Sequence, residues 1–328
     1  MIFQFFNRKK LIILMYHGFT DKIYQNGIEN YQGKHINIEL FRSQISYLKK
    51  YYNILSLEEC VRYFIEKENF PDKSAVITID DGYKSNYTLA FPIFKEFDIP
   101  ATIFLTTDFV DNQKFLWVDR LECALNYTKA KHLEIKVGEE KLYFPLICRK
   151  DKMSCDKSLR VKLKSMDYAY IEKIISEIEN KLHVKVSELT NVPEIYQPLQ
   201  WDEILKMTNT TRVSIGNHTQ KHLILTRYAN KIIKNELMLS KEIIQKKTGI
   251  NTRLFSYPNG AHGDFNANTK LILKELGYSC ALTTVSGMNN KFSDIYELKR
   301  FGIGNTDLKT FILTTSGVKN FVSEIKGY

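Results

Sequence analysis

Short apolar runs alternate with helical segments along most of this chain, and this alternation limits the possible folds more than any other feature. Helical spacing of apolar residues is clear at 38–50 and 229–247, and a capping box opens a further helix at Ser56. Strands separated by helices at this spacing form βαβ units and therefore a parallel sheet. The apolar runs that we interpret as buried strands lie at 11–16, 52–55, 76–79, 99–105, 213–216, 253–256, 280–284 and 298–303.

The alternation is interrupted between residues 111 and 200, where the sequence becomes more polar. This stretch predicts a hairpin at 132–144 around Gly138 and one or two charged helices at 159–182. We interpret 111–200 as an inserted lid or subdomain. The remaining segments, 1–110 and 201–328, have about the size of a (β/α) barrel. The predicted fold is therefore α/β, a distorted, TIM-like barrel of seven or eight strands that carries an insertion.

Polar side chains directly follow several of the apolar runs, at what would be the carboxyl ends of the strands. In parallel barrels this end is where active sites are built. Taken alone, Asp80-Asp81-Gly82 is an ordinary turn sequence, and a single pair of histidines four residues apart is most often accidental. Their shared position indicates a site. The residues in this position are His17, Asp80, Asp81, His218, His222 and the turn at 258–260.

The segment His218-Thr-Gln-Lys-His222 has the spacing of a metal-binding pair. Two imidazoles four residues apart lie on the same face of a helical turn and can hold one metal ion. A carboxylate from elsewhere in the chain can supply a third ligand.

The formal net charge is +10, and basic residues gather at Arg8-Lys9-Lys10 and between Lys141 and Lys164. Such an excess can meet nucleic acid, anionic lipid or an acidic glycan, but it also fits ordinary solvated surfaces. No nucleic-acid-binding motif accompanies the charge, so we expect no nucleic-acid partner. A phosphate-bearing substrate would suit this positive charge.

The five cysteines are widely spaced and form no CxxC pair, which argues against a disulfide framework and against a zinc-thiolate site. The apolar run after Lys10 is too short for a signal sequence. We therefore expect a cytoplasmic protein. Residues 1–6 and the basic triplet suggest peripheral contact with the inner face of an anionic membrane.

With these residues in view, the chain resembles the polysaccharide deacetylases of carbohydrate esterase family 4, in particular the subgroup that acts on exopolysaccharides and surface glycans. The resemblance covers most of 11–110 and 200–303 and leaves the insertion unexplained. Its carriers are Met15-Tyr-His17, Thr78-Ile-Asp-Asp-Gly-Tyr83, Pro100-Ala-Thr-Ile-Phe104, Trp201-Asp202, Gly216-Asn-His-Thr-Gln-Lys-His222 and Phe255-Ser-Tyr-Pro-Asn-Gly260.

The resemblance implies a metal-dependent hydrolase with defined residue roles. Asp80 would be the general base, and Asp81, His218 and His222 would bind a divalent metal, usually Zn²⁺. The backbone N–H of Asn259 would stabilise the oxyanion. Tyr83, Tyr257, Pro258 and Trp117 are the candidate substrate-binding residues, although Trp117 could equally anchor the core of the insertion.

The sequence departs from the family pattern at two places. Many members carry an arginine two residues before the proline of the last motif, where this chain has Ser256. Arg300 is the candidate substitute that orients Asp80, unless it forms only a salt bridge at the rim. Many members also have a late Leu-x-His that protonates the leaving amine. That motif is missing, and His17 is a better substitute than His262.

The sequence thus predicts an enzyme that removes an N-acetyl group from an amino sugar of a polysaccharide, lipid-linked or nucleotide-linked precursor, or surface glycan. The same ligands could serve a deformylase or an O-acetyl esterase. A non-catalytic glycan-binding barrel is a further alternative, since fold does not fix function. His35, His132 and His183 have no motif around them and are expected at the surface.

Overall fold

The computed structural model describes residues 9–22 and 27–316, which form two compact units. The first unit contains the described residues up to Asp21, Lys34–Gln113 and those from Pro198 onward. The second contains the described residues of Lys22–Gly33 and Lys114–Gln197. Lys22–Gly33 thus groups with the predicted insertion, whereas its sequence position alone suggests the barrel.

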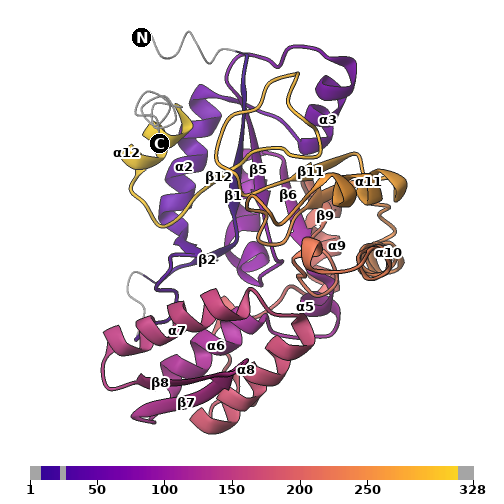
Figure 1. Cartoon of the computed structure of the whole chain (residues 1–328). Helices are drawn as coiled ribbons and strands as arrows, with labels where there is room; N and C mark the ends of the chain where they lie inside the picture. The colour runs from indigo at the N-terminus through magenta and orange to yellow at the C-terminus, as the bar shows by residue number, and fades with distance from the viewer. Residues whose placement is uncertain (1–8, 23–26, 317–328) are drawn as a thin grey trace, which may run out of the picture. The chain divides into compact units, whose positions relative to one another are not determined.

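A parallel sheet of eight strands forms the centre of the first unit (Figure 1). Seven strands follow the order β11-β10-β9-β6-β5-β1-β12, and β4 pairs with the start of β5. The alternation of apolar runs and helices therefore produces the predicted parallel topology. The strands are β1 (Leu11–Tyr16), β4 (Asn53–Ile54), β5 (Ser74–Ile79), β6 (Ala101–Leu105), β9 (Val213–Asn217), β10 (Leu254–Ser256), β11 (Cys280–Leu282) and β12 (Phe301–Gly302).

The segment that leads into β12 links the two ends of this strand order. Leu298 forms a parallel bridge with Leu282 of β11, and its backbone N–H donates to Ala281 O at 3.0 Å. Four residues later Gly302 pairs with Met15 of β1. The short segment 298–302 therefore pairs with β11 at one end of the order and with β1 near the other end, as in a distorted barrel.

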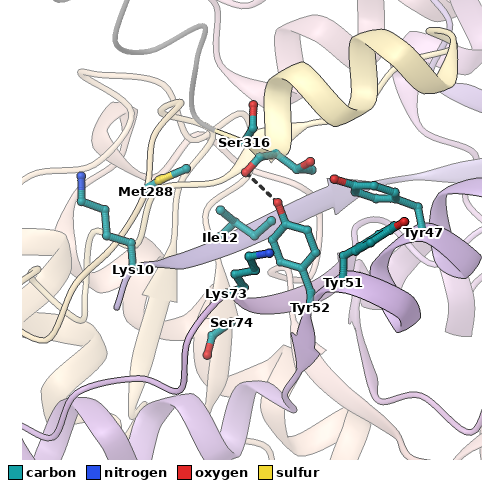
Figure 2. Close-up of a pocket in the computed structure, with 10 residues that line it drawn as sticks. Lys10, Ile12, Tyr47, Tyr51, Tyr52, Lys73, Ser74, Met288 and Ser316 are labelled. Carbon is teal, nitrogen blue, oxygen red and sulfur yellow. Dashed lines mark hydrogen bonds between the residues drawn. The ribbon is translucent and has the colours of Figure 1, made fainter. Parts of the chain in front are cut away.

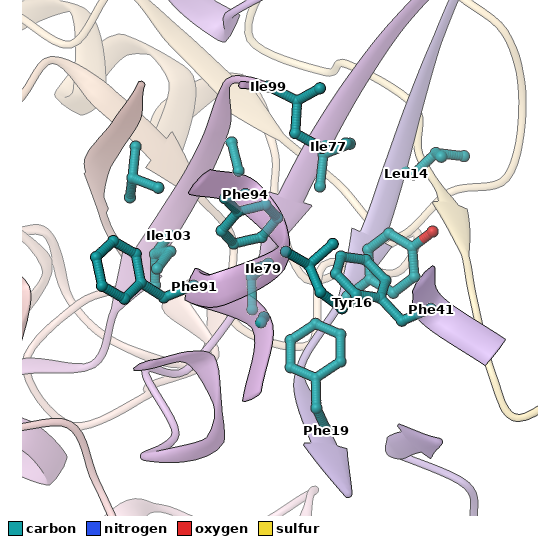
Figure 3. Close-up of a cluster of buried hydrophobic side chains, with 14 of the residues drawn as sticks. Leu14, Tyr16, Phe19, Phe41, Ile77, Ile79, Phe91, Phe94, Ile99 and Ile103 are labelled. Carbon is teal, nitrogen blue, oxygen red and sulfur yellow. The ribbon is translucent and has the colours of Figure 1, made fainter. Parts of the chain in front are cut away.

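Apolar side chains of β1 and β5 pack beneath two helices in the largest buried cluster (Figure 3). Phe41 of α2 lies 5.2 Å from the Tyr16 ring and 5.8 Å from Phe94 of α4, in edge-to-face geometry. Such aromatic pairs add to the stabilisation that burial provides. This packing fixes the strands whose ends carry the candidate site.

One predicted helix start is confirmed in the first unit. The capping box at Ser56 is present, with Glu59 donating and accepting in the reciprocal pattern. A π-helical turn, Asn86–Ala90, precedes α4, so that Pro92 falls in the first turn of that helix, where its missing N–H is tolerated. The helices are α2 (Ile38–Tyr51), α3 (Leu57–Glu66), α4 (Phe91–Phe97), α5 (Thr107–Asp111), α9 (Trp201–Thr210), α10 (Asn230–Thr248), α11 (Ala267–Glu275) and α12 (Leu308–Thr315).

A cavity of about 230 Å³ opens at the amino-terminal ends of β1 and β5 (Figure 2). Ile12 and Ser74 line it together with the rings of Tyr47, Tyr51 and Tyr52. Since Asp80 follows the other end of β5, this cavity lies away from the predicted site and contains none of its residues.

The second unit has its own hydrophobic core. The predicted hairpin around Gly138 forms from β7 (His132–Val137) and β8 (Glu140–Pro145), paired in antiparallel register. The α-helices described in this unit are α6 (Trp117–Tyr127), α7 (Arg149–Leu163) and α8 (Tyr168–Leu182). Trp117 is 8% exposed and belongs to this core, which agrees with its alternative interpretation as an anchor of the insertion.

A buried polar network in the second unit surrounds Glu122. This carboxylate accepts hydrogen bonds from Tyr196 Oη at 3.0 Å and from the Asn30 amide at 2.9 Å. Arg160 Nη2 lies 3.7 Å away and Arg160 also pairs with Asp156. Burial raises the pKa of Glu122 to about 7, although Arg160 and the Asn30 amide oppose the shift.

The raised pKa predicts a pH-dependent contribution to stability. Because folded Glu122 holds its proton more tightly than the unfolded residue does, the free energy of unfolding falls as pH rises to about 7. Glu122→Gln should remove this loss. Between pH 5 and pH 8, the free energy of unfolding of the variant should therefore rise by roughly 1–3 kcal/mol relative to that of the unmodified protein. Urea unfolding at both pH values measures the effect, with the fully exposed Glu139→Gln as control. A pH profile parallel to that of the unmodified protein would contradict it.

No helix within residues 9–22 and 27–316 combines the length and the apolar character that a membrane span requires. The predicted membrane contact through Met1–Phe6 and Arg8 lies outside the described residues.

Candidate active site

The two adjacent aspartates lie in a sharp turn at the end of β5. Asp80 continues the ladder with β1 through its amide, which donates to Tyr16 O at 2.9 Å. The Gly82 amide then donates to Asp80 O at 3.1 Å, and Asp81 adopts a φ of 76°. This hydrogen bond closes a three-residue γ-turn, a strained conformation that is common at functional sites. Both carboxylates are nearly inaccessible, at 2% and 3% exposure.

Asp81 meets both predicted histidines. Its Oδ1 lies 3.6 Å from His218 Nε2 and 3.5 Å from His222 Nε2, and the three ligand atoms lie within 4.8 Å of one another. Two atoms bound to one tetrahedral ion, with bonds of about 2.0–2.2 Å, are roughly 3.3 Å apart. The sequence separation between Asp81 and His218 is bridged because β5, β6 and β9 are neighbours in the sheet.

The residues present fit a divalent metal ion. Asp81 Oδ1 is buried and has no hydrogen-bond partner, so a cation would satisfy it. His218 Nδ1 contacts Ser256 O at 2.7 Å, which leaves Nε2 as the lone-pair donor toward the site. Burial lowers the pKa of His222 to about 3, so its imidazole stays neutral and able to coordinate.

The loop that carries both histidines differs from the prediction. Residues 218–222 form an irregular loop rather than a helical turn. Thr219 and His222 have φ values of 68° and 59°, in the left-handed region. The two imidazole centroids are nevertheless only 4.9 Å apart. The two imidazoles can thus reach one metal ion because the backbone of the loop turns back on itself, and not because of helical periodicity.

Arg300 holds Asp80 in a bidentate ion pair. Nη1 donates to Oδ1 at 2.8 Å and Nη2 donates to Oδ2 at 2.7 Å. The remaining N–H groups donate to Thr283 O, Thr78 Oγ1 and Ser256 Oγ, so all five donors of the guanidinium are used. Both side chains are buried, at 0% and 2% exposure, so the contact is not a salt bridge at the rim.

The Arg300 pair explains the departure at Ser256. The Ser256 hydroxyl accepts from Arg300 Nη2 at 2.9 Å and lies 3.4 Å from Asp80 Oδ2. An arginine at 256 would compete for the space that the Arg300 guanidinium occupies. Burial alone would raise the pKa of Asp80, but the charge and hydrogen bonds of Arg300, together with the charges of His218 and His17, outweigh burial and hold that pKa well below its usual range.

The turn after β10 repeats the geometry of the Asp81 turn. The Gly260 amide donates to Pro258 O at 2.7 Å across Asn259, whose φ is 63°. Thr284 fixes the turn, because its hydroxyl donates to Asn259 O at 2.7 Å and its amide to Gly260 O at 2.9 Å. The backbone of Asn259 is therefore held in one conformation.

Several predicted substrate-binding residues have packing roles. The Tyr257 ring is 1% exposed, stacks on Phe265 at 5.1 Å, and its hydroxyl donates to Tyr296 O. Tyr83 is fully buried against Phe109 and its hydroxyl contacts Lys34. Pro258 is also buried. These side chains, like that of Trp117, are buried in this structure, and their contact with a substrate stays a prediction.

The remaining histidines divide into three groups. His17 is half-buried at the exit of β1, and burial lowers its pKa although the charges of Asp81 and Asp80 oppose the shift. His262, His132 and His183 are exposed, as expected for the last two. The expected surface position of His35 is wrong. Its ring is 2% exposed because β3 (His35–Asn37) pairs with β2 (Gly18–Thr20) and packs the ring 4.7 Å from Tyr83.

One residue near the centre carries no sequence signal. Lys34 Nζ lies 3.9 Å from Asp81 Oδ2, beside its contact with Tyr83. It precedes a three-residue strand and follows no apolar run, so the rule that points to strand ends could not find it.

Comparisons with known proteins agree with the fold and with these motifs. The sequence profile of the family described as "Polysaccharide deacetylase" matches residues 67–281, about two thirds of the chain. The chain therefore belongs to the polysaccharide deacetylase family, as its motifs predict.

Two relatives are named poly-β-1,6-N-acetyl-D-glucosamine N-deacetylases. The one from Staphylococcus epidermidis is 38% identical over 89 residues, which cover 27% of this chain and 29% of that protein. The one from Staphylococcus aureus strain MSSA476 is 36% identical over 95 residues, which cover 29% of this chain and 31% of that protein. The matched part thus spans less than a third of the length of these relatives.

Solved structures share the fold over nearly the whole chain. The Streptococcus pyogenes deacetylase PplD, in complex with acetate, has a TM-score of 0.60 at 20% identity and covers 94% of this chain and 99% of its own. IcaB from Ammonifex degensii has a TM-score of 0.57 at 16% identity and covers 94% and 96%. The α/β barrel prediction is confirmed.

Proposed function

We propose that this protein is a metal-dependent hydrolase that removes the N-acetyl group from an amino sugar of a polysaccharide or of a surface-glycan precursor. The observation that carries the proposal is the meeting of Asp81, His218 and His222 beside an Asp80 carboxylate that a buried arginine keeps ionised. The names of the staphylococcal relatives support a substrate built from N-acetylglucosamine.

In this proposal Asp81 and the two histidines hold the ion. One carboxylate oxygen and two imidazole nitrogens suit Zn²⁺ and leave coordination positions open. When bound, such an ion polarises a carbonyl and lowers the pKa of a coordinated water. Asp80 is adjacent to the ligands but directs its carboxylate to Arg300, which suits it to accept a proton during attack on the amide.

Two further groups complete the proposed chemistry. The Asn259 amide belongs to a turn that Thr284 holds rigid, and a fixed backbone donor of this kind stabilises an oxyanion without reorganisation. Burial lowers the pKa of His17, and the charges of Asp81 and Asp80 oppose the shift; His17 is the candidate that donates a proton to the leaving amine. Its backbone is fixed because His17 O accepts from Asn86 Nδ2 at 2.8 Å.

Acetate release from a β-1,6-linked N-acetylglucosamine oligomer tests this function. We expect release by the untreated protein, loss after dialysis against a chelator, and recovery when Zn²⁺ is restored. N-formyl and O-acetyl analogues of the same oligomer test the deformylase and esterase alternatives. Release that the chelator leaves unchanged would refute the metal-dependent reaction, and no release from any of the three would refute the hydrolase.

The lipid-linked or nucleotide-linked form of the substrate, the cytoplasmic location and the contact with an anionic membrane stay predictions. The basic residues of the chain support only the phosphate-bearing substrate and the membrane contact.

A further inference from the structure

The loop at 218–222 lacks regular secondary structure, yet its backbone polar groups are held on two sides. On one side the His218 amide donates to Leu105 O at 3.0 Å, and the amides of Thr107 and Asp108 donate to the carbonyls of Thr219 and Gln220 at 3.1 and 2.8 Å. These contacts fix the loop to the end of β6 and to the first turn of α5.

Side chains hold the amides of the loop on the other side. Asn217 Oδ1 accepts from the Thr219 amide at 2.7 Å, and Asn217 is itself fixed by Ser240 and Tyr278. The Glu236 carboxylate, from α10, accepts the Lys221 amide. The Gln220 amide also favours the charged form of Glu236, although burial raises the pKa of this carboxyl. Glu236 is 5% exposed.

The loop needs such support because its backbone is strained. Thr219 is β-branched and His222 is bulky, and both have positive φ. Residues other than glycine are destabilised in sparsely populated regions of this kind and persist there only where the surroundings enforce the conformation.

We propose that Glu236 is a positioning residue that holds His222 in the geometry for metal binding. His218 has independent anchors, because it directly follows β9 and its ring contacts Ser256 O. His222 lies beyond the strained backbone, one residue after the amide that Glu236 accepts, and its side chain is 25% exposed. Loss of Glu236 should therefore release His222 more than His218.

This inference rests on the proposed metal site and extends it to a residue that lies outside every recognised motif. Mutation of a residue that orients a metal ligand through hydrogen bonds typically weakens metal binding 10–100-fold. Glu236→Gln keeps the volume of the side chain and one acceptor oxygen, so it can accept only one of the two amides, Gln220 and Lys221, and its NH2 group must face the other. Glu242→Gln makes the same change at an exposed position of the same helix and is the matched control.

The test measures Zn²⁺ affinity by competition with a chromophoric chelator, together with the visible spectrum of the Co²⁺ form. We expect Glu236→Gln to weaken Zn²⁺ binding by roughly 10–100-fold and to change the Co²⁺ spectrum, while Glu242→Gln changes neither. In a His222→Ala background, Glu236→Gln should cause no further loss of affinity. An unchanged affinity in Glu236→Gln, or an equal loss in the His222→Ala background, would overturn the proposal.

Hydrogen exchange on the unmodified, metal-free protein tests the proposal even if Glu236→Gln does not fold. The amides of Gln220 and Lys221 should already be protected before metal is added. Exchange at the rate of an exposed loop would overturn the positioning role. Absence of any Zn²⁺ binding by the unmodified protein would instead refute the proposed function, so the two failures are distinguishable.

Discussion

Replacing Asp80 by asparagine is expected to remove nearly all deacetylase activity and to leave metal binding intact. Asparagine has the shape of aspartate but cannot accept a proton at neutral pH, and general base catalysis typically contributes 10²–10⁴-fold. We therefore expect turnover of the N-acetylglucosamine oligomer to fall by roughly 10²-fold or more. The ligands Asp81, His218 and His222 are untouched, so the metal content should stay the same.

The appropriate control for this substitution is Asp98→Asn. Asp98 is exposed and has a φ of 45°, a conformation that asparagine also tolerates. Because Asp80→Asn leaves the Arg300 charge without its partner, urea unfolding must show that the variant is folded under the assay conditions. A folded Asp80→Asn variant with full activity would exclude Asp80 as the base.

Arg300→Met is expected to affect both stability and activity. Removing one partner of a buried ion pair usually costs roughly 3–5 kcal/mol, since the other charge is left without compensation. The Asp80 carboxylate should then take up a proton more readily and lose its fixed orientation, so kcat should fall and its acidic limb should move to higher pH. Lys299→Met, at the exposed neighbouring position, should change neither quantity.

A relocated arginine provides a stricter version of this experiment. Ser256 Oγ lies 2.9 Å from Arg300 Nη2, at the position where the family resemblance leads us to expect the arginine. The double variant Ser256→Arg, Arg300→Ser should recover part of the activity that Arg300→Met loses. Activity of Arg300→Met close to that of the unmodified protein would show that the ion pair does not orient the base.

The alternation of apolar runs and helices predicts the sheet well because burial dominates those segments. Runs such as 99–105 and 213–216 became β6 and β9 with boundaries shifted by one or two residues. Active sites of parallel barrels lie at the carboxyl ends of the strands, and this rule correctly predicted that Asp81 lies close to His218 and His222. It depends only on topology, which the hydrophobic pattern determines.

Features that depend on tertiary contacts were not predictable in the same way. The γ-turns at Asp81 and Asn259 and the left-handed Thr219 reflect hydrogen bonds from distant segments, and local propensity does not encode these. Tyr257 shares a motif with site residues, but its ring alternates to the opposite face and packs in the core. His35 is buried by a strand pair of only three residues, too short to show periodicity.

Metal analysis of the purified protein tests the central claim most directly. Elemental analysis should find about one zinc ion per chain in the unmodified protein and in Asp80→Asn, and almost none in His218→Ala. The same metal content in His218→Ala as in the unmodified protein, with both folded, would contradict the account, because Asp81, His218 and His222 would then not form the metal site.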